Sequence, residues 1–329
     1  MTVATGHDAI DLASMTRIGA GLHRPECVVT NARGDVYTAD WRGGVAHIGP
    51  DGGQALYRCE LPGDRPARPN GIALRRDGSF LFADLGAELG GVFALSRDGT
   101  VRPFLEEIDG IALPPSNFVV EDALGRVWIT VSTRSVPRAR AYRRDVADGF
   151  VVQVDRRGAR IVADGLGYTN EAILDARGEW LYVNETFARI TSRFPVRPDS
   201  SLGRREVYVE YGPGTYPDGM AFDEDGHLWV VSIISNRVLR VAPDRTIATI
   251  VEDSDPEHVA WVEQAYAAGE IGRPHLDGVR SRMLRNISSI AFGGDDRRTA
   301  YLGCLLDDAI YAFRSPVAGL APAHWNWPV

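Results

Sequence analysis

Residues 215–232 read TYPDGMAFDEDGHLWVVS, and this stretch decides the fold. An alternating apolar run at residues 218–222 leads into an acidic turn at 223–226, and a second apolar run follows at 228–231. Two apolar runs that flank a turn containing Asp and Gly predict a β-hairpin. Asp218 lies at the start of the first predicted strand, where a buried carboxylate is costly unless a donor or a cation compensates its charge.

The same hairpin template recurs across the whole chain. Each copy begins with a polar residue, and we call these the leading residues: Glu26, Asn70, Asn117, Asn170, Asp218 and Ser288. They follow one another at intervals of 44 to 53 residues, with one longer interval of 70 before the last. A period of about 40–50 residues made of short strands is typical of a four-stranded propeller blade. The sequence therefore predicts an all-β fold, a single six-bladed β-propeller domain over residues 1–329, because two stacked sandwiches would not explain one period.

Closure of the ring and two insertions complete this prediction. We expect residues 14–20 to form the outer strand of the last blade beside residues 309–315, because a ring with a free edge would be prone to association. Residues 133–148 carry five arginines, and residues 252–286 contain Asp255 followed by Pro256, a signal for the start of a short helix. We expect both insertions to be lids over one mouth of the propeller, with surface decoration as the alternative.

Composition restricts the function classes. The chain is 44% apolar and 24% charged, as in soluble globular proteins, and its net charge of −8 argues against a general nucleic-acid binder. Three cysteines without CxxC spacing indicate a reducing compartment and disfavour a thiolate metal site. The sequence shows neither a secretory leader nor an apolar run of membrane-spanning length. We expect a cytoplasmic protein without nucleic-acid or membrane partners, and the sequence says nothing of its oligomeric state.

The leading residues are rich in oxygen atoms. If they begin the innermost strands, the symmetry of the propeller places them around the central channel at one depth. Two carboxylates and three carboxamides suit a hard cation, and the absence of Cys and His disfavours a zinc site of the thiolate or imidazole kind. The alternative is that Asn70 and Asp218, each followed by Gly, are only turn formers. We expect one divalent cation, with Ca²⁺ first and Zn²⁺, Mg²⁺ or Mn²⁺ as alternatives.

A resemblance to a known family sharpens this expectation. The chain resembles the senescence marker protein/gluconolactonase (regucalcin-like) family in four stretches: RPE (24–26), NFVVEDALGR (117–126), TNEAILDARGEWLYVNE (169–185) and YPDGMAFDEDGHLWV (216–230). The resemblance implies a divalent metal in the channel of a six-bladed propeller, held by residues that match Glu26, Asn170 and Asp218. It also implies that Asn117 helps to hold the substrate or a metal-bound water.

One position departs from the family pattern. Sugar-acid lactonases of the family carry an arginine two residues before the asparagine of the third blade, and Pro115 stands there in this chain. A proline side chain donates no hydrogen bond, so a sugar lactone is disfavoured as substrate. Either the arginines of residues 133–148 take over this contact, or the substrate is less polar.

The predicted activity is metal-dependent hydrolysis of a small lactone. The cation would act as a Lewis acid on the lactone carbonyl, and water would attack. Asp218 is the candidate general base, and a metal-bound hydroxide oriented by Asp218 and Asn117 is the alternative. Candidate substrate contacts are Asn70, Asn117, Tyr168 and Tyr216, although both tyrosines would also suit the core. Two other classes remain open: a strictosidine synthase-like propeller with condensation or C–C chemistry, and a non-catalytic calcium-binding or ligand-sensing propeller.

Overall fold

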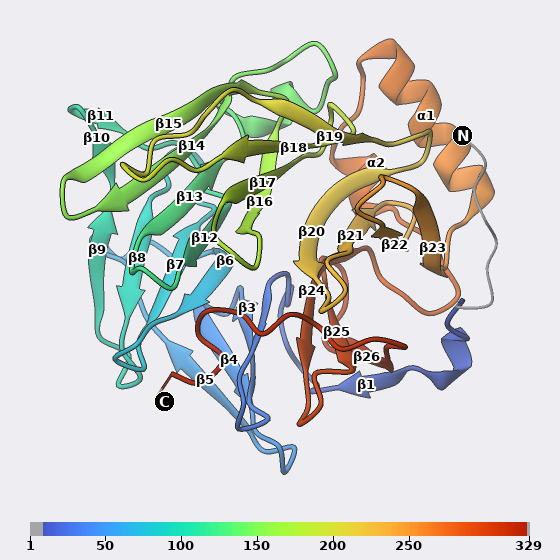
Figure 1. The fold of residues 1–329 in the computed structure, drawn as a ribbon, viewed down its shortest axis with the longest axis horizontal. Coiled ribbons are helices and arrows are strands. Elements are labelled where there is room, and N and C mark those ends of the chain that lie inside the picture. Colours follow the sequence, from blue (N-terminus) through green and yellow to red (C-terminus); the bar gives the residue numbers. More distant parts are fainter. Residues whose placement is uncertain (1–8, 328–329) are drawn as a thin grey trace.

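Six four-stranded antiparallel sheets surround a central axis in the computed structural model, which describes residues 9–327 (Figure 1). This arrangement confirms the predicted six-bladed β-propeller. The sequence prediction about a secretory leader falls partly on residues 1–8, which lie outside the described residues. The first three blades are β2 (Val28–Thr30), β3 (Val36–Asp40), β4 (Gly44–Ile48) and β5 (Gln54–Arg58); β6 (Pro69–Leu74), β7 (Phe80–Asp84), β8 (Val92–Leu95) and β9 (Val101–Leu105); and β12 (Phe118–Glu121), β13 (Val127–Val131), β14 (Gly149–Asp155) and β15 (Gly158–Leu166).

The other three blades follow the same plan, with one difference at the closure. They are β16 (Thr169–Leu174), β17 (Trp180–Glu185), β18 (Ile190–Pro195) and β19 (Glu206–Glu210); β20 (Tyr216–Phe222), β21 (Leu228–Ile233), β22 (Arg237–Val241) and β23 (Ile247–Glu252); and β24 (Ile287–Gly293), β25 (Thr299–Cys304), β26 (Ile310–Arg314) and β1 (Thr16–Ile18). The N-terminal strand β1 pairs antiparallel with β26, with Thr16 opposite Ala312. The predicted closure is thus confirmed, and the ring is joined by strands from both ends of the chain.

Hydrophobic packing holds each blade to its neighbours. Tyr37 of the first blade packs in one cluster with Phe82 and Phe93 of the second, and Trp229 of the fifth blade packs with Phe292 of the sixth. The remaining blade pairs share similar clusters. Because burial of apolar surface drives this packing, every blade depends on the two beside it.

The acidic turn of the opening stretch has a structural role. The Asp223 carboxylate accepts hydrogen bonds from the Trp229 indole (2.9 Å), from the Arg240 guanidinium (2.8 Å) and from the backbone N–H of His227 (2.8 Å). Asp122 occupies the corresponding turn of the third blade and accepts from the Trp128 indole at 3.0 Å. These aspartates therefore anchor the tryptophans of their blades.

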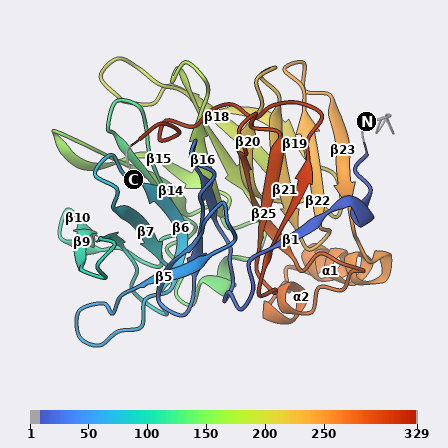
Figure 2. The ribbon, with the colours of Figure 1, turned by 90° about the horizontal axis from the view of Figure 1, so that it is seen from below.

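Both insertions lie between strands, as predicted. The first contains the short 3₁₀ helix η2 (Arg138–Ala141), and the second contains α1 (Pro256–Ala268) and α2 (Arg273–Asp277). The Asp255 side chain accepts hydrogen bonds from the first turn of α1, which confirms the predicted helix start. Figure 2 shows α1 and α2 at one end of the propeller and the C-terminal segment at the other. A two-stranded hairpin of β10 (Glu107–Ile108) and β11 (Ile111–Ala112) extends from the second blade.

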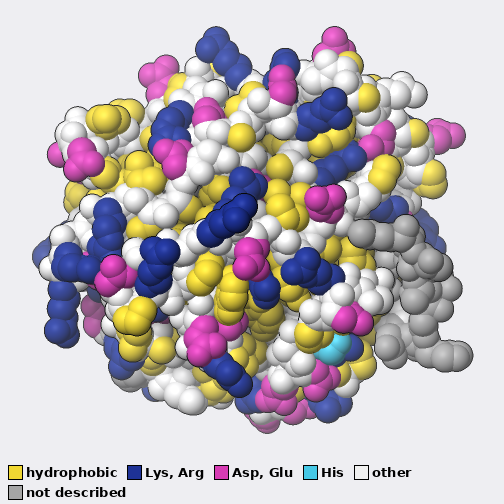
Figure 3. All heavy atoms as spheres, turned by 45° about the horizontal axis from the view of Figure 1, so that its top comes forward, with side chains coloured by type: hydrophobic (Ala, Val, Ile, Leu, Met, Phe, Trp, Pro, Cys, Tyr) yellow, Lys and Arg dark blue, Asp and Glu magenta, His cyan; other side chains and the backbone are white. Residues whose placement is uncertain are grey.

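The surface carries mixed charge. On the part of the face that is coloured in Figure 3, basic and acidic side chains are interspersed, with hydrophobic side chains between them. Among the helices in residues 9–327, none is both long and apolar enough to cross a membrane.

Candidate active site

All six leading residues are buried at the start of the innermost strands. The pairing of these strands is interrupted there in four blades, by register shifts at residues 69–72, 169–172, 217–220 and 287–289. A β-bulge of this kind leaves residues out of the hydrogen-bonded ladder and redirects their side chains. In these four blades the bulges therefore free the leading residues from the regular alternation of a strand.

The backbone before the leading residues is also unusual. Arg24, Tyr168 and Asn286 adopt positive φ angles of 53°, 68° and 59°, and each lies two residues before a leading residue. Such angles are uncommon for residues other than glycine and cluster at functional sites.

Glycine at position 219 allows two inner strands to approach closely. A Cβ atom there would lie 2.4 Å from the Ser289 Cα and 2.5 Å from the Ser288 carbonyl oxygen, both on the neighbouring strand β24. Gly71 has the same relation to the third blade, with Phe118 Cα at 2.5 Å. The Gly after a leading residue thus serves the contact between blades at the channel.

The Asp218 carboxylate is buried without a hydrogen-bond donor. It is 4% exposed, and no described residue donates to its oxygen atoms. Burial and the charges of Glu26 and Glu171 raise the pKa of Asp218 well above its ordinary value, although Arg24 and Arg138 oppose this shift. A buried carboxylate in this state is unfavourable, and a bound cation would remove the cost.

Glu26 is engaged through only one of its two oxygen atoms. Arg24 donates to Oε2 from Nε at 2.9 Å, and its Nη2 lies 2.8 Å from the same atom. Within residues 9–327, no donor reaches Oε1. The Ser288 hydroxyl donates to the Glu26 backbone carbonyl at 3.0 Å and so ties the sixth blade to the first.

Two of the three leading asparagines donate hydrogen bonds from their amide nitrogens to the protein. Asn170 Nδ2 donates to Thr186 Oγ1 at 3.2 Å, and Asn70 Nδ2 donates to the Asn117 carbonyl at 3.0 Å. The Oδ1 atoms of Asn70 and Asn117 are buried without any partner. Unpaired buried acceptors are uncommon in folded proteins and point to a missing partner.

These donor-free oxygen atoms fit a hard cation. Five leading side chains contribute them: Glu26, Asn70, Asn117, Asn170 and Asp218. Ca²⁺ is bound in proteins by carboxylate and amide oxygens of this kind, and the set contains neither sulfur nor imidazole.

A second acidic group does not need a cation. Asp223, Asp225 and His227 lie close enough to share an ion. Asp223, however, already accepts the three hydrogen bonds described above, and Arg240 also pairs with Asp225 at 3.1 Å. The protein itself compensates these charges, in contrast to Asp218.

The two predicted substrate tyrosines lie in different surroundings. Tyr168 packs edge-on against Tyr142 and Phe187, with ring centroids 5.4 and 4.9 Å apart. Tyr216 is fully buried, and its hydroxyl is engaged by Glu263 of α1 and by Arg189. Tyr168 interacts electrostatically with Asp218, whereas the Tyr216 hydroxyl belongs to the contact with α1.

Both insertions pack at this end of the channel. Ala141 and Tyr142 from the first insertion share one hydrophobic cluster with Val262 and Leu276 from the second, and with Tyr168. Arg138, one turn before Tyr142, interacts electrostatically with Glu26 and Asp218. The five arginines of the insertion were recognisable in the sequence, but their order along the chain did not single out Arg138.

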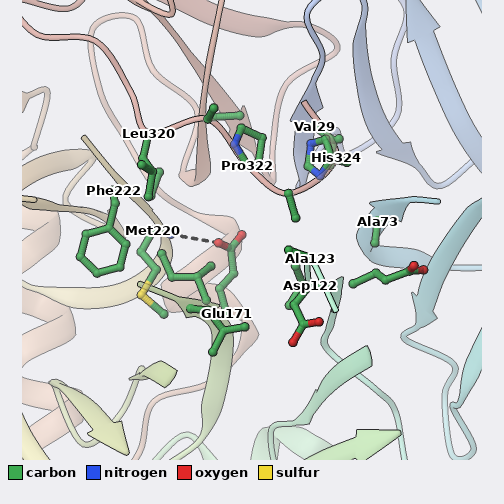
Figure 4. A pocket seen from close by; sticks show the side chains of 18 of the residues that line it. Val29, Ala73, Asp122, Ala123, Glu171, Met220, Phe222, Leu320, Pro322 and His324 are labelled. Atoms are coloured by element: carbon green, nitrogen blue, oxygen red, sulfur yellow. Dashed lines mark hydrogen bonds between the residues drawn. The ribbon is translucent and has the colours of Figure 1, made fainter. Parts of the chain in front are cut away.

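Glu171 is a further buried carboxyl group that the sequence interpretation missed. Burial and the charge of Glu26 raise its pKa to about 8, although the hydrogen bond from the Met220 N–H to Oε2 (2.9 Å) opposes this. Glu171 also lines a cavity of about 490 Å³ that reaches the C-terminal segment. Figure 4 shows Glu171 there together with Leu320, Pro322 and His324. In a regular strand, consecutive side chains point to opposite faces. The bulge at residues 169–172 interrupts this alternation, so the sequence pattern did not reveal Glu171.

Known proteins resemble this chain in sequence and in fold. Residues 67–261, more than half of the chain, match the family described as the SMP-30/Gluconolactonase/LRE-like region. A 6-deoxy-6-sulfogluconolactonase from Pseudomonas putida is 27% identical over 283 residues, which cover 84% of this chain and 81% of that protein.

Two solved structures share the architecture. A gluconolactonase from Xanthomonas campestris has a TM-score of 0.67 at 17% identity, covering 92% of this chain and 89% of that one. The calcium-binding protein regucalcin from Agrobacterium tumefaciens has a TM-score of 0.65 at 17% identity, covering 92% and 95%. At such identities the structural likeness shows the fold alone, and the sequence match carries the assignment. The chain belongs to the SMP-30/gluconolactonase/LRE-like family.

Proposed function

We propose that the protein is a metal-dependent lactonase that hydrolyses a small lactone at the end of the channel where the inner strands begin. The reaction class is supported by the family and by the relative named a sulfogluconolactonase. The observation that carries the site is the Asp218 carboxylate, which is buried without a donor among side chains that offer only oxygen atoms.

Glu26, Asn170 and Asp218 would hold the cation. Each has an oxygen atom that no described residue engages, and Arg24 and Thr186 fix the other polar atoms of Glu26 and Asn170. When bound, a divalent cation supplies a Lewis acid that stabilises negative charge on the lactone carbonyl oxygen. We expect Ca²⁺, because the donor set is made of hard oxygen atoms.

The protein side chains supply positioning and a base. Asn117 Oδ1, buried without a partner, can accept a hydrogen bond from the attacking water and so orient it. Asp218 is the candidate to take the proton of that water, because Glu26, the other leading carboxylate, is occupied by Arg24. Asn70 and Tyr168 remain candidates for substrate contacts, and the cytoplasmic location remains a prediction.

A chelation experiment tests the proposal. Purified protein is stripped with a chelator and assayed against a panel of aliphatic, sugar and aromatic lactones, with and without Ca²⁺, Mg²⁺, Mn²⁺ or Zn²⁺. We expect turnover that is lost on stripping and restored by at least one cation. Cation binding without turnover of any lactone would instead favour a calcium-binding or ligand-sensing propeller. Turnover that survives complete removal of metal would refute the metal-dependent mechanism.

A further inference from the structure

The first insertion places one guanidinium among the leading residues. Its residues Ala141 and Tyr142 are buried, and the Tyr142 ring lies 5.4 Å from that of Tyr168 and 4.9 Å from that of Phe187. Tyr168 lies two residues before Asn170, so this packing fixes the insertion against the wall of the candidate site. Arg138 begins the same short helix and is half-buried there.

Within the part of the chain that the structure describes, Arg138 has no hydrogen-bond or ion-pair partner, unlike Arg134 and Arg143 of the same insertion. Arg134 pairs with Asp164 at 2.7 Å, and Arg143 pairs with Asp145 at 2.7 Å. Within residues 9–327, Arg138 makes neither a hydrogen bond nor an ion pair. A half-buried guanidinium has lost part of its hydration, so a group that restores its hydrogen bonds would bind favourably.

The charges around Arg138 give the sign of that group. Burial lowers the pKa of Arg138, but interactions with Tyr168, Tyr142, Glu26 and Asp218 outweigh this and raise it, so the side chain stays charged. When Asp218 and Glu26 are both ionised, the guanidinium groups of Arg24 and Arg138 balance these two leading carboxylates. A bound divalent cation would leave an excess of positive charge, which an anionic substrate would neutralise.

We propose that Arg138 binds an anionic oxygen substituent of the substrate, so that the preferred lactones carry a carboxylate or a sulfonate group. This inference rests on the proposed lactone hydrolysis. A guanidinium presents paired N–H donors that match such groups in a bidentate manner. Pro115 stands where related sugar-acid lactonases carry an arginine, and Arg138 would supply a guanidinium in its place. This favours the explanation that an arginine of residues 133–148 takes over the contact, over the explanation that the substrate is less polar.

A pair of substrates that differ in charge tests the assignment. The metal-loaded protein is assayed with 5-oxotetrahydrofuran-2-carboxylate and with the corresponding carboxamide. For the wild type we expect kcat/KM to favour the carboxylate by at least about 10-fold. Arg138→Gln should lower kcat/KM for the carboxylate by about 10- to 100-fold, mainly through KM, as expected for loss of a charge-assisted hydrogen bond. The carboxamide should change by less than about threefold.

Two variants control for folding and for charge alone. Arg138→Lys keeps the positive charge but loses the paired donors, so we expect an intermediate loss. Arg140→Gln removes an exposed guanidinium of the same insertion, which donates only to the Val136 carbonyl, and should behave as the wild type. Equal losses on both lactones in Arg138→Gln, or no preference for the carboxylate in the wild type, would overturn the inference.

A binding measurement separates this inference from the proposed function. Calorimetry compares tetrahydrofuran-2-carboxylate, which cannot be hydrolysed, with its carboxamide in the wild type and in Arg138→Gln. If no lactone is turned over but the carboxylate still binds through Arg138, the proposed function fails and the anion site stands. If both compounds bind equally to both proteins, the anion site fails whatever the turnover.

Discussion

The two ends of the channel are formed by the same inner strands but carry different chemistry. At the end where the strands begin, carboxylates and carboxamides present oxygen atoms without donors, and Arg24 and Arg138 lie among them. At the other end, the strands and the C-terminal segment line a largely apolar cavity. Of its carboxyl groups, Glu121 and Asp122 pair with arginines, and Glu171 accepts a hydrogen bond from the Met220 N–H. In four of the six inner strands a bulge lies between the residues that face the two ends.

Removing the charge of Asp218 should have the largest effect. Asp218→Asn keeps the shape of the side chain and one coordinating oxygen, but removes the negative charge and the basic function. Turnover should fall by at least about 100-fold, as is typical for loss of a general base, and further if metal is lost. Steady-state kinetics and elemental analysis of the purified variant measure both effects.

Asn70→Ala is the control for Asp218→Asn within the same ring of residues. The Asn70 side chain donates to the Asn117 carbonyl, and the family resemblance gives it no direct role at the metal. We expect a much smaller loss of turnover than for Asp218→Asn. Near-normal hydrolysis and metal content in Asp218→Asn, together with their loss in Asn70→Ala, would show that the roles are assigned wrongly.

The close approach of two inner strands at Gly219 should be the next most sensitive feature. In Gly219→Ala the new Cβ would meet backbone atoms of Ser288 and Ser289 that cannot move freely. We expect a loss of about 1–3 kcal/mol in the free energy of unfolding, typical of overpacking, together with weaker cation binding. Gly212→Ala is the matched control, since its Cβ would meet no atom within 4 Å. Equal stability of the two variants would contradict the close approach.

Glu171 tests whether the apolar end contributes to catalysis. The Gln side chain can still accept the hydrogen bond from Met220, so Glu171→Gln should change turnover by less than about threefold. The raised pKa of about 8 means that the folded protein holds a proton that the unfolded chain releases at lower pH. The stability of the chelated wild type should therefore fall as pH rises from about 4.5 to about 8, by at most about 5 kcal/mol. In denaturant titrations, Glu171→Gln should show a flatter dependence of stability on pH than the wild type. A loss of turnover in Glu171→Gln comparable to that in Asp218→Asn would contradict the contrast between the two ends.

The C-terminal segment should respond to pH in the opposite sense to Glu171 and with a smaller effect. Burial lowers the pKa of His324 to about 4, and its Nε2 lies 3.1 Å from the Thr30 carbonyl. Because the unfolded chain binds this proton more tightly, stability should fall as pH falls from about 6.5 to about 4, by at most about 3 kcal/mol. Hydrogen exchange of residues 320–324 should show the change in the wild type but not in His324→Gln. Identical pH profiles of hydrogen exchange in the wild type and in His324→Gln would refute this role of His324.

The hairpin period alone predicted the ring, because each blade is a local unit whose turn and apolar runs are adjacent in the chain. The same locality explains why the start of α1 after Asp255 was predicted correctly. Closure by β1 joins the two ends of the chain and was predicted from the free edge that an open ring would leave. The leading residues were recognisable because they precede apolar strands, where a polar side chain stands out.

The surroundings of the leading residues could not be predicted from the sequence. The contact of Arg24 with Glu26 accompanies a left-handed backbone at Arg24, and Glu171 escapes the alternation rule through a bulge. The place of Arg138 depends on how Tyr142 packs against aromatic residues from another blade. The first two depend on local backbone geometry that the residue types alone do not determine, and the place of Arg138 depends on contacts between segments far apart in the chain.

The most direct test of the central claim is the location of the cation. Crystals of the protein grown with Mn²⁺ or Ca²⁺ would show the ion by its anomalous scattering. The account predicts one ion in the channel, with oxygen atoms of Glu26, Asn170 and Asp218 among its ligands. An empty channel at saturating cation, or an ion bound only by Asp223, Asp225 and His227, would contradict it.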